Sequence, residues 1–182
     1  MANGLKFTLG LAFVSLIRLI PMPLPNMEPI MATMLPFARK YGKVAGFLFS
    51  FLALLSFDFI SGRVGMWTVY TGIAYGIIGF AAGKYFSSNN RQKMKYYLGF
   101  GLVGTIFYDA ITAFIFGIQF GQPLAMTIAG QIPFTIYHLI GTAAFILVLT
   151  PVVNRIIVEN PMLELGGVGA KRPFAAKHQK RD

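Results

Sequence analysis

Five ionisable residues stand in stretches of the sequence that are otherwise almost entirely apolar: Arg18, Glu28, Asp58, Asp109 and His138. A charged side chain at bilayer depth costs at least about 2.5 kcal/mol, so it is usually paired or placed in a water-filled cavity. In such a cavity, carboxylates and an imidazole could orient a bound solute, carry a proton or hold a metal ion. These residues are therefore the first candidates for a functional site.

Most of them also have a purely structural explanation. Arg18 could form an ion pair with Glu28 or Asp58 that locks two helix ends together. Arg63, five residues after Asp58 in the sequence, could also take part in such a structural ion pair. A histidine on an apolar helix, such as His138, is often a hydrogen-bonded packing residue. The structural and the functional explanations both stay open for these residues.

Asp109 is harder to explain by packing alone. Its immediate neighbours are Phe107, Tyr108, Ala110 and Ile111, which together offer a single hydroxyl group. A partner for the carboxylate must therefore come from another helix or from a ligand. We expect Asp109 to have a functional role.

The composition indicates an integral membrane protein. The chain has 182 residues, of which 55% are hydrophobic and 12% charged, and its mean hydropathy is +0.63. Soluble domains carry roughly 25% charged residues, so this chain has too few to cover a water-facing surface. The net charge is +10, and the absence of cysteine excludes disulfides, thiolate metal sites and cysteine nucleophiles.

The apolar segments predict an all-α fold, a bundle of six transmembrane helices in residues 1–160. A bilayer-spanning helix needs about 20 apolar residues. The six segments are residues 5–20, 26–37, 44–61, 66–85, 96–118 and 123–158. The second is short and bounded by Pro29 and Pro36, and the sixth is long enough to predict a break or a surface-lying start around Gly130 to Pro133.

The distribution of basic residues predicts the topology. Lysine and arginine accumulate in cytoplasmic loops. They gather in the loops 39–43 and 84–95 and in the C-terminal tail, whereas the loops 21–25 and 119–122 contain none. Both termini should therefore be cytoplasmic, and residues 161–182 should form a flexible basic cytoplasmic tail that is too short to predict nucleic-acid binding.

With this topology, the polar residues of the spans gather toward the outer side, above an apolar inner half. Such a layout is expected of a receptor that captures a solute from outside. Trp67 and Tyr70 could instead belong to the aromatic belt found at membrane surfaces. The predicted substrate-binding residues are Asn26, Glu28, Asp58, Trp67, Tyr70, Tyr108, Asp109, Gln131 and His138.

Small residues recur in the fourth segment, where Gly72-x-x-x-Gly76 and Gly79-x-x-x-Gly83 place glycines on one helix face. Glycine lets helix backbones approach each other closely in lipid. This face could pack within the bundle, or it could dock a separate membrane subunit.

Missing motifs exclude several chemistries. The chain has no Gly-x-x-x-x-Gly-Lys-Ser/Thr loop and no His-Glu-x-x-His motif. The first absence predicts a transport subunit without its own ATPase motif, and the second predicts that no metal is bound. We therefore predict no catalytic residues. Two alternatives remain. A small proton-coupled secondary transporter would use Asp58 or Asp109 as its proton site, and a membrane-embedded metal-dependent enzyme would use both with His138.

Three stretches of the sequence resemble the substrate-binding S components of energy-coupling factor (ECF) transporters. They are Arg18-Leu-Ile-Pro-Met-Pro-Leu-Pro-Asn-Met-Glu-Pro29, then Asp58 with Gly62 and Gly65-Met-Trp-Thr-Val-Tyr70, then Ala74-Tyr-Gly-Ile-Ile-Gly79. The resemblance implies a protein of the cytoplasmic (inner) membrane that binds a vitamin or similar micronutrient at the extracellular side. It also implies a transmembrane T component and two ATPase subunits as partners, and no permanently bound cofactor.

The resemblance further implies particular roles for residues. Asn26, Glu28, Trp67 and Tyr70 would line the pocket, and the cytoplasmic half of the first helix would meet the T component. The family often has Ala-x-x-x-Ala on that helix, whereas the nearest match here is Thr8-x-x-x-Ala12, which encloses Gly10. The segment Trp-Thr-x-Tyr is most similar to that of cobalamin-type members, which implies cobalamin as the ligand.

Overall fold

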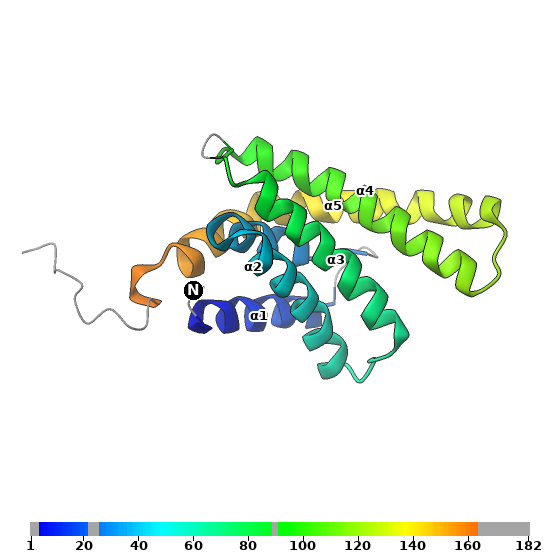
Figure 1. Cartoon of the computed structure of the whole chain (residues 1–182), viewed down its shortest axis with the longest axis horizontal. Helices are drawn as coiled ribbons and strands as arrows, with labels where there is room; N and C mark the ends of the chain where they lie inside the picture. Colours follow the sequence, from blue (N-terminus) through cyan, green and yellow to red (C-terminus); the bar gives the residue numbers. More distant parts are fainter. Residues whose placement is uncertain (1–3, 22–25, 89–90, 164–182) are drawn as a thin grey trace, which may run out of the picture.

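The computed structural model describes residues 4–21, 26–88 and 91–163, and every regular element in these residues is helical (Figure 1). The prediction of an all-α fold is therefore confirmed. The elements are α1 (Gly4–Leu19), α2 (Ile30–Ile60), α3 (Met66–Tyr85), α4 (Met94–Gln119), α5 (Leu124–Val153), the π-helical turn η1 (Asn154–Val158) and the 3-10 turn η2 (Pro161–Leu163). The predicted tail beyond Leu163 lies outside the described residues.

Helix α2 is divided by a kink at Gly42, whose φ of +86° is a left-handed conformation that favours glycine. The part of α2 before the kink begins just after Glu28, which faces Arg18 at the end of α1. It runs to the opposite end of the bundle, where Arg39 pairs with Glu159. The segment after the kink runs back, so that Phe57 lies under the Arg18 guanidinium. The two parts of α2 are therefore antiparallel passes of the chain.

Both ends of the described chain lie at the same end of the bundle. Lys6, near the start of α1, donates a hydrogen bond of 2.9 Å from Nζ to the carbonyl oxygen of Val158 in η1. Helices α3, α4 and α5 complete the bundle, with α4 and α5 running side by side as an antiparallel pair (Figure 1). We call the end that contains Lys6 the inner end, and the end that contains Arg18 the outer end.

Pro36 does not end its helix, contrary to the predicted boundary at residue 37. A proline lacks the N–H that would bond to the carbonyl four residues earlier, here that of Ala32. The hydroxyl of Thr150 in α5 donates to this carbonyl at 2.8 Å, and the contact is buried. A residue far away in the sequence thus satisfies the group that the proline leaves open, and the helix continues to the kink at Gly42.

Thr150→Val is expected to destabilise the protein, because valine keeps the shape of threonine but leaves the buried Ala32 carbonyl unpaired. The expected cost is about 1–3 kcal/mol, seen as a lower Tm in detergent. Thr8→Val is the matched control, since the Thr8 hydroxyl is exposed and bonds only within its own helix, to Gly4. Equal Tm values for the two variants would contradict this explanation of Pro36.

The predicted break at Gly130 to Pro133 is wrong, because α5 runs without interruption through Pro133. A proline removes one backbone hydrogen bond, and packing holds the helix on both sides of that position. Toward the outer end, Gly117 of α4 lies against Thr127, and toward the inner end Gly141 lies against Met27. These contacts with α4 and with the turn before α2 support α5 on both sides of Pro133.

The glycines of α3 pack inside the bundle against the second part of α2. A Cβ added at Gly79 would meet the backbone of Gly46, and one added at Gly83 would meet the backbone of Lys43. Further along the same face, Gly72 lies against the ring of Phe51 and Gly76 against that of Phe47. Of the two explanations for this face, the structure supports packing within the bundle.

In the part of the chain that the structure describes, three helical stretches are long and apolar enough, by length and composition, to cross a membrane. They are Ile30–Ile60, Met94–Gln119 and Leu124–Val158. Together with the composition, they identify the chain as a membrane protein.

Candidate functional site

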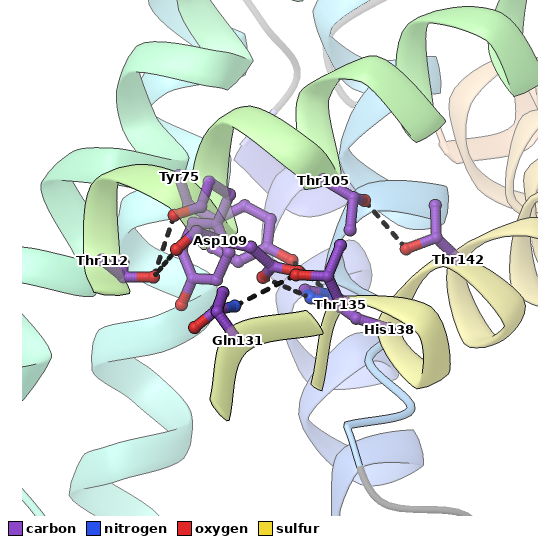
Figure 2. Close-up of polar contacts among 9 residues, drawn as sticks. Tyr75, Thr105, Asp109, Thr112, Gln131, Thr135, His138 and Thr142 are labelled. Atoms are coloured by element: carbon purple, nitrogen blue, oxygen red, sulfur yellow. Dashed lines mark hydrogen bonds and ion pairs between the residues drawn. The ribbon is translucent and has the colours of Figure 1, made fainter. Parts of the chain in front are cut away.

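A buried acid and a buried histidine meet near the middle of the bundle. Asp109 of α4 and His138 of α5 are 1% and 2% exposed, and Asp109 Oδ1 lies 2.8 Å from His138 Nδ1 (Figure 2). The other ring nitrogen, Nε2, lies 3.5 Å from the hydroxyl of Tyr75 in α3. One turn further inward, the hydroxyls of Thr105 and Thr142 are 3.0 Å apart. Polar contacts therefore connect three helices at this level.

Two tyrosines enclose this pair. The ring centroids of Tyr75 and Tyr108 are 4.1 Å apart, and Tyr108 meets the imidazole of His138 edge-on at 5.9 Å. Tyr75 was not among the predicted site residues. Its position between Ala74 and Gly76, where small neighbours let other helices approach the ring, is the sequence signal that could have identified it.

The second carboxylate oxygen of Asp109, Oδ2, is buried and has no hydrogen-bond partner among the described residues. Buried polar atoms in proteins are nearly always paired, so each exception requires an explanation. Because His138 occupies Oδ1, the carboxylate is held in one orientation and Oδ2 is the atom left for another partner.

Arg18 and Glu28 lie close to this cluster. Arg18 Nη2 is 3.8 Å from Glu28 Oε1, and its guanidinium stacks over the Phe57 ring at 3.9 Å. Glu28 interacts electrostatically with His138 and with both tyrosines of the cluster. The preceding residue, Met27, packs closely on Gly141 of α5 and so brings Glu28 to the cluster. A Cβ added at Gly141 would lie only 3.0 Å from the Cα of Met27.

Arg63, the other predicted member of a structural ion pair, is exposed, and its side chain forms no ion pair with any residue that the structure describes. Its backbone N–H donates to the carbonyl of Asp58 at 2.8 Å. The Asp58 side chain accepts a hydrogen bond of 2.5 Å from the hydroxyl of Thr68. The same hydroxyl accepts from the N–H of Gly65, so Asp58 and Thr68 fix the start of α3.

A cavity of about 310 Å³ lies at the outer end, between the start of α3, the end of α4 and the start of α5. Trp67 stacks on Phe116 with a centroid distance of 4.1 Å, and Tyr70 meets the same ring edge-on at 6.2 Å. Gln131 lies in the wall and donates from Nε2 to Thr135 at 3.1 Å (Figure 2). The lining is mostly aromatic and apolar, with a few polar groups, which is the usual character of a small-molecule site.

The cavity and the buried cluster adjoin each other. Thr112 lines the cavity, and its hydroxyl donates to the backbone carbonyls of Tyr108 and Asp109. Phe134 also lines the cavity and meets the His138 ring edge-on at 6.1 Å. The structure therefore brings seven predicted residues to this region: Glu28, Trp67, Tyr70, Tyr108, Asp109, Gln131 and His138.

Asn26 and Asp58 lie at the edges of this arrangement. Asn26 has a positive φ of 60° in the turn that precedes α2, a conformation that asparagine tolerates well. Asp58 interacts electrostatically with Tyr108 while its carboxylate is bonded to Thr68. Both remain predicted ligand-binding residues.

The residues predicted to dock a partner are divided between two faces of α1. Thr8 and Ala12 are exposed, one turn apart, and Thr8 lines an open groove of about 560 Å³ between α1 and α2. Gly10 is buried, because a Cβ there would lie 2.5 Å from the Phe37 ring. Gly10 therefore has a packing role within the chain, whereas Thr8 and Ala12 are available to a partner.

Within the described residues, no group of three or more His, Cys, Asp or Glu side chains lies close enough to hold a metal ion. Asp58 is engaged with Thr68 at the start of α3, and Asp109 with His138. Asp58 is therefore separate, in its contacts, from the pair formed by Asp109 and His138.

The comparisons with known proteins give one result. Residues 7–165 match the model of a protein family described as ECF-type riboflavin transporter, S component. No curated protein and no solved structure matches the chain.

Proposed function

Because the chain belongs to the family of ECF-type riboflavin transporter S components, we propose that it captures a flavin at the outer face of the membrane. It is the membrane-embedded substrate-binding component of an ECF transporter, a transport subunit and not an enzyme. The observation that supports this location of the site is the aromatic cavity at the outer end, which adjoins a buried polar cluster. Aromatic rings would bind the flat ring system, and polar groups would fix its orientation.

The chain crosses the cytoplasmic membrane six times, with both termini in the cytoplasm. The two antiparallel parts of α2, together with the other four helices, supply six passes. Basic residues gather at the inner end, where Lys6 and Arg39 lie, as expected for a cytoplasmic side. The first part of α2 is shorter than the roughly 30 Å hydrocarbon core, but residues 30–38 are buried among other helices, so lipid does not contact them.

Riboflavin is the ligand that the family description names, and the cavity supports it better than the cobalamin implied by the Trp-Thr-x-Tyr segment. Sites for small ligands usually have volumes of about 300–1,000 Å³, and the cavity of about 310 Å³ is at the lower limit. A flat three-ring compound can enter beside Trp67 and Phe116, whereas a bulky corrinoid would require the surrounding helices to move apart.

Transport requires a partner that supplies energy. A T component docks on the exposed face of α1 that contains Thr8 and Ala12, beside the groove toward α2, and two ATPase subunits drive release of the ligand to the cytoplasm. Support for this surface comes from its position at the inner half of α1 and from its small side chains, which allow close helix contact.

Trp67→Ala is expected to weaken riboflavin binding about tenfold or more, because the variant loses the largest aromatic face of the cavity. Binding is measured by quenching of flavin fluorescence in detergent. Phe114→Ala is the matched control, since Phe114 is an exposed aromatic residue of α4, half a turn from Phe116, that does not line this cavity. Equal Kd values for wild type and Trp67→Ala would contradict this site, and wild-type binding of cobalamin instead of riboflavin would contradict the ligand.

A further inference from the structure

Three buried polar atoms near the outer end have no hydrogen-bond partner among the described residues. They are Arg18 Nη1, Glu28 Oε1 and Asp109 Oδ2, and they come from α1, from the turn before α2 and from α4. All three side chains interact electrostatically with both Tyr75 and Tyr108. Contacts place them in the same region: Arg18 lies 3.8 Å from Glu28, and Met27, next to Glu28, packs on Gly141, about one turn along α5 from the His138 that bonds Asp109.

The ion pair between Arg18 and Glu28 does not satisfy these groups. Its closest atoms are 3.8 Å apart, too far for a hydrogen bond, and each side chain keeps an unpaired buried atom. A buried ion pair offsets the loss of hydration only when its geometry is good and its other polar atoms are bonded. An oxygen of Asp109, which is 1% exposed, is also left open. Within the residues that the structure describes, no group completes these three atoms, and a bound solute could do so.

The chemistry of these atoms defines that group. A guanidinium only donates hydrogen bonds and ionised carboxylates only accept them, so the site offers one donor and two acceptors. A hydroxyl group both donates and accepts, so two or three neighbouring hydroxyls can satisfy the three atoms at once. An imide has one N–H between two carbonyl oxygens, so it could donate to one of the two carboxylates but not to both.

We propose that Arg18, Glu28 and Asp109 form a polyol subsite that binds the hydroxylated side chain of the flavin, while the ring system occupies the cavity beside Trp67 and Phe116. The inference rests on the proposed function. Thr112 connects the two parts along α4, because it lines the cavity and lies about one turn from Asp109, to whose backbone carbonyl its hydroxyl donates. His138 is a positioning residue, since its bond to Oδ1 directs Oδ2 of Asp109 toward the subsite.

Two flavins separate the subsite from the ring cavity. Riboflavin and lumiflavin share the same ring system, but lumiflavin has a methyl group in place of the hydroxylated chain. Wild-type protein should bind riboflavin more tightly than lumiflavin, and Glu28→Gln or Asp109→Asn should reduce that preference about tenfold, because each removes one charge-assisted hydrogen bond. The measurement is the ratio of the two Kd values for each variant.

Glu159→Gln is the matched control. It removes a carboxylate that pairs with Arg39 at the inner end of the bundle, and it should keep the wild-type ratio. Size-exclusion profiles and Tm values show which variants are folded, and Glu28→Gln decides the question if Asp109→Asn does not fold. Riboflavin and lumiflavin bound equally by wild type, or a wild-type ratio in folded Glu28→Gln, would overturn the subsite while leaving the proposed function intact. Failure of wild type to bind either flavin would overturn the proposed function itself.

Discussion

Gly79→Val is expected to prevent the formation of a stable bundle. The backbone carbonyl of Gly46 in α2 occupies the place that a Cβ at position 79 would need. The Ser50 hydroxyl would lie only 2.6 Å from that Cβ. Inserting side-chain atoms into a packed core typically costs about 1–3 kcal/mol, and the cost is higher here because the obstructing atoms belong to a helix backbone that cannot rotate away. Helices α2 and α3 would have to separate along their whole contact.

The measurement is the yield of monodisperse protein in detergent, together with its Tm. Gly99→Val is the matched control, because Gly99 is also helical and a Cβ there meets nothing within 4 Å. We expect Gly99→Val to behave like wild type, whereas Gly79→Val aggregates or melts far earlier. A Gly79→Val protein with the elution profile and Tm of wild type would show that the two helices do not cross at these glycines.

Asp109→Ala is expected to have the second large effect, on both stability and ligand binding. The substitution leaves the His138 imidazole buried at 2% exposure without its closest partner. Breaking a buried pair by removing one member costs about 3–5 kcal/mol, which corresponds to a Tm lower by roughly 10 °C. Riboflavin binding should be lost as well, because the carboxylate is part of the proposed polyol subsite.

A double variant separates these two effects. Asp109→Leu with His138→Leu replaces both buried polar groups by apolar ones, and such replacements are often neutral or stabilising. The double variant should therefore recover most of the Tm lost in Asp109→Ala but none of the riboflavin affinity. Recovery of riboflavin binding together with stability would mean that the pair only supports packing, and would contradict its role in ligand binding.

Much of the architecture could be predicted from local sequence. The apolar segments 66–85 and 5–20 correspond closely to α3 and α1, because the length and composition of an apolar segment depend only on neighbouring residues. The kink in α2 fell within the basic loop predicted at residues 39–43, although the chain there stays helical on both sides of Gly42. The interpretation of Asp109 as a residue whose partner lies on another helix also came from its immediate neighbours, and that partner is His138.

Other features could not be predicted from neighbouring residues. Which partner Asp109 would find, the contribution of Tyr75 and the approach of Glu28 to the same cluster all depend on how the helices pack. The predicted docking set was separated for the same reason, because Gly10 turned out to face Phe37 and Phe49 inside the bundle.

The sequence by itself determined that this is a helical membrane protein with costly polar groups inside its spans, since composition and hydropathy are local properties. Only the tertiary structure decided that α2 passes Pro36, that α5 passes Pro133 and that Asp109 pairs with His138. The physical reason is that each of these outcomes depends on a contact between distant residues. The Thr150 hydroxyl that satisfies the Ala32 carbonyl, 118 positions away along the chain, is the clearest example.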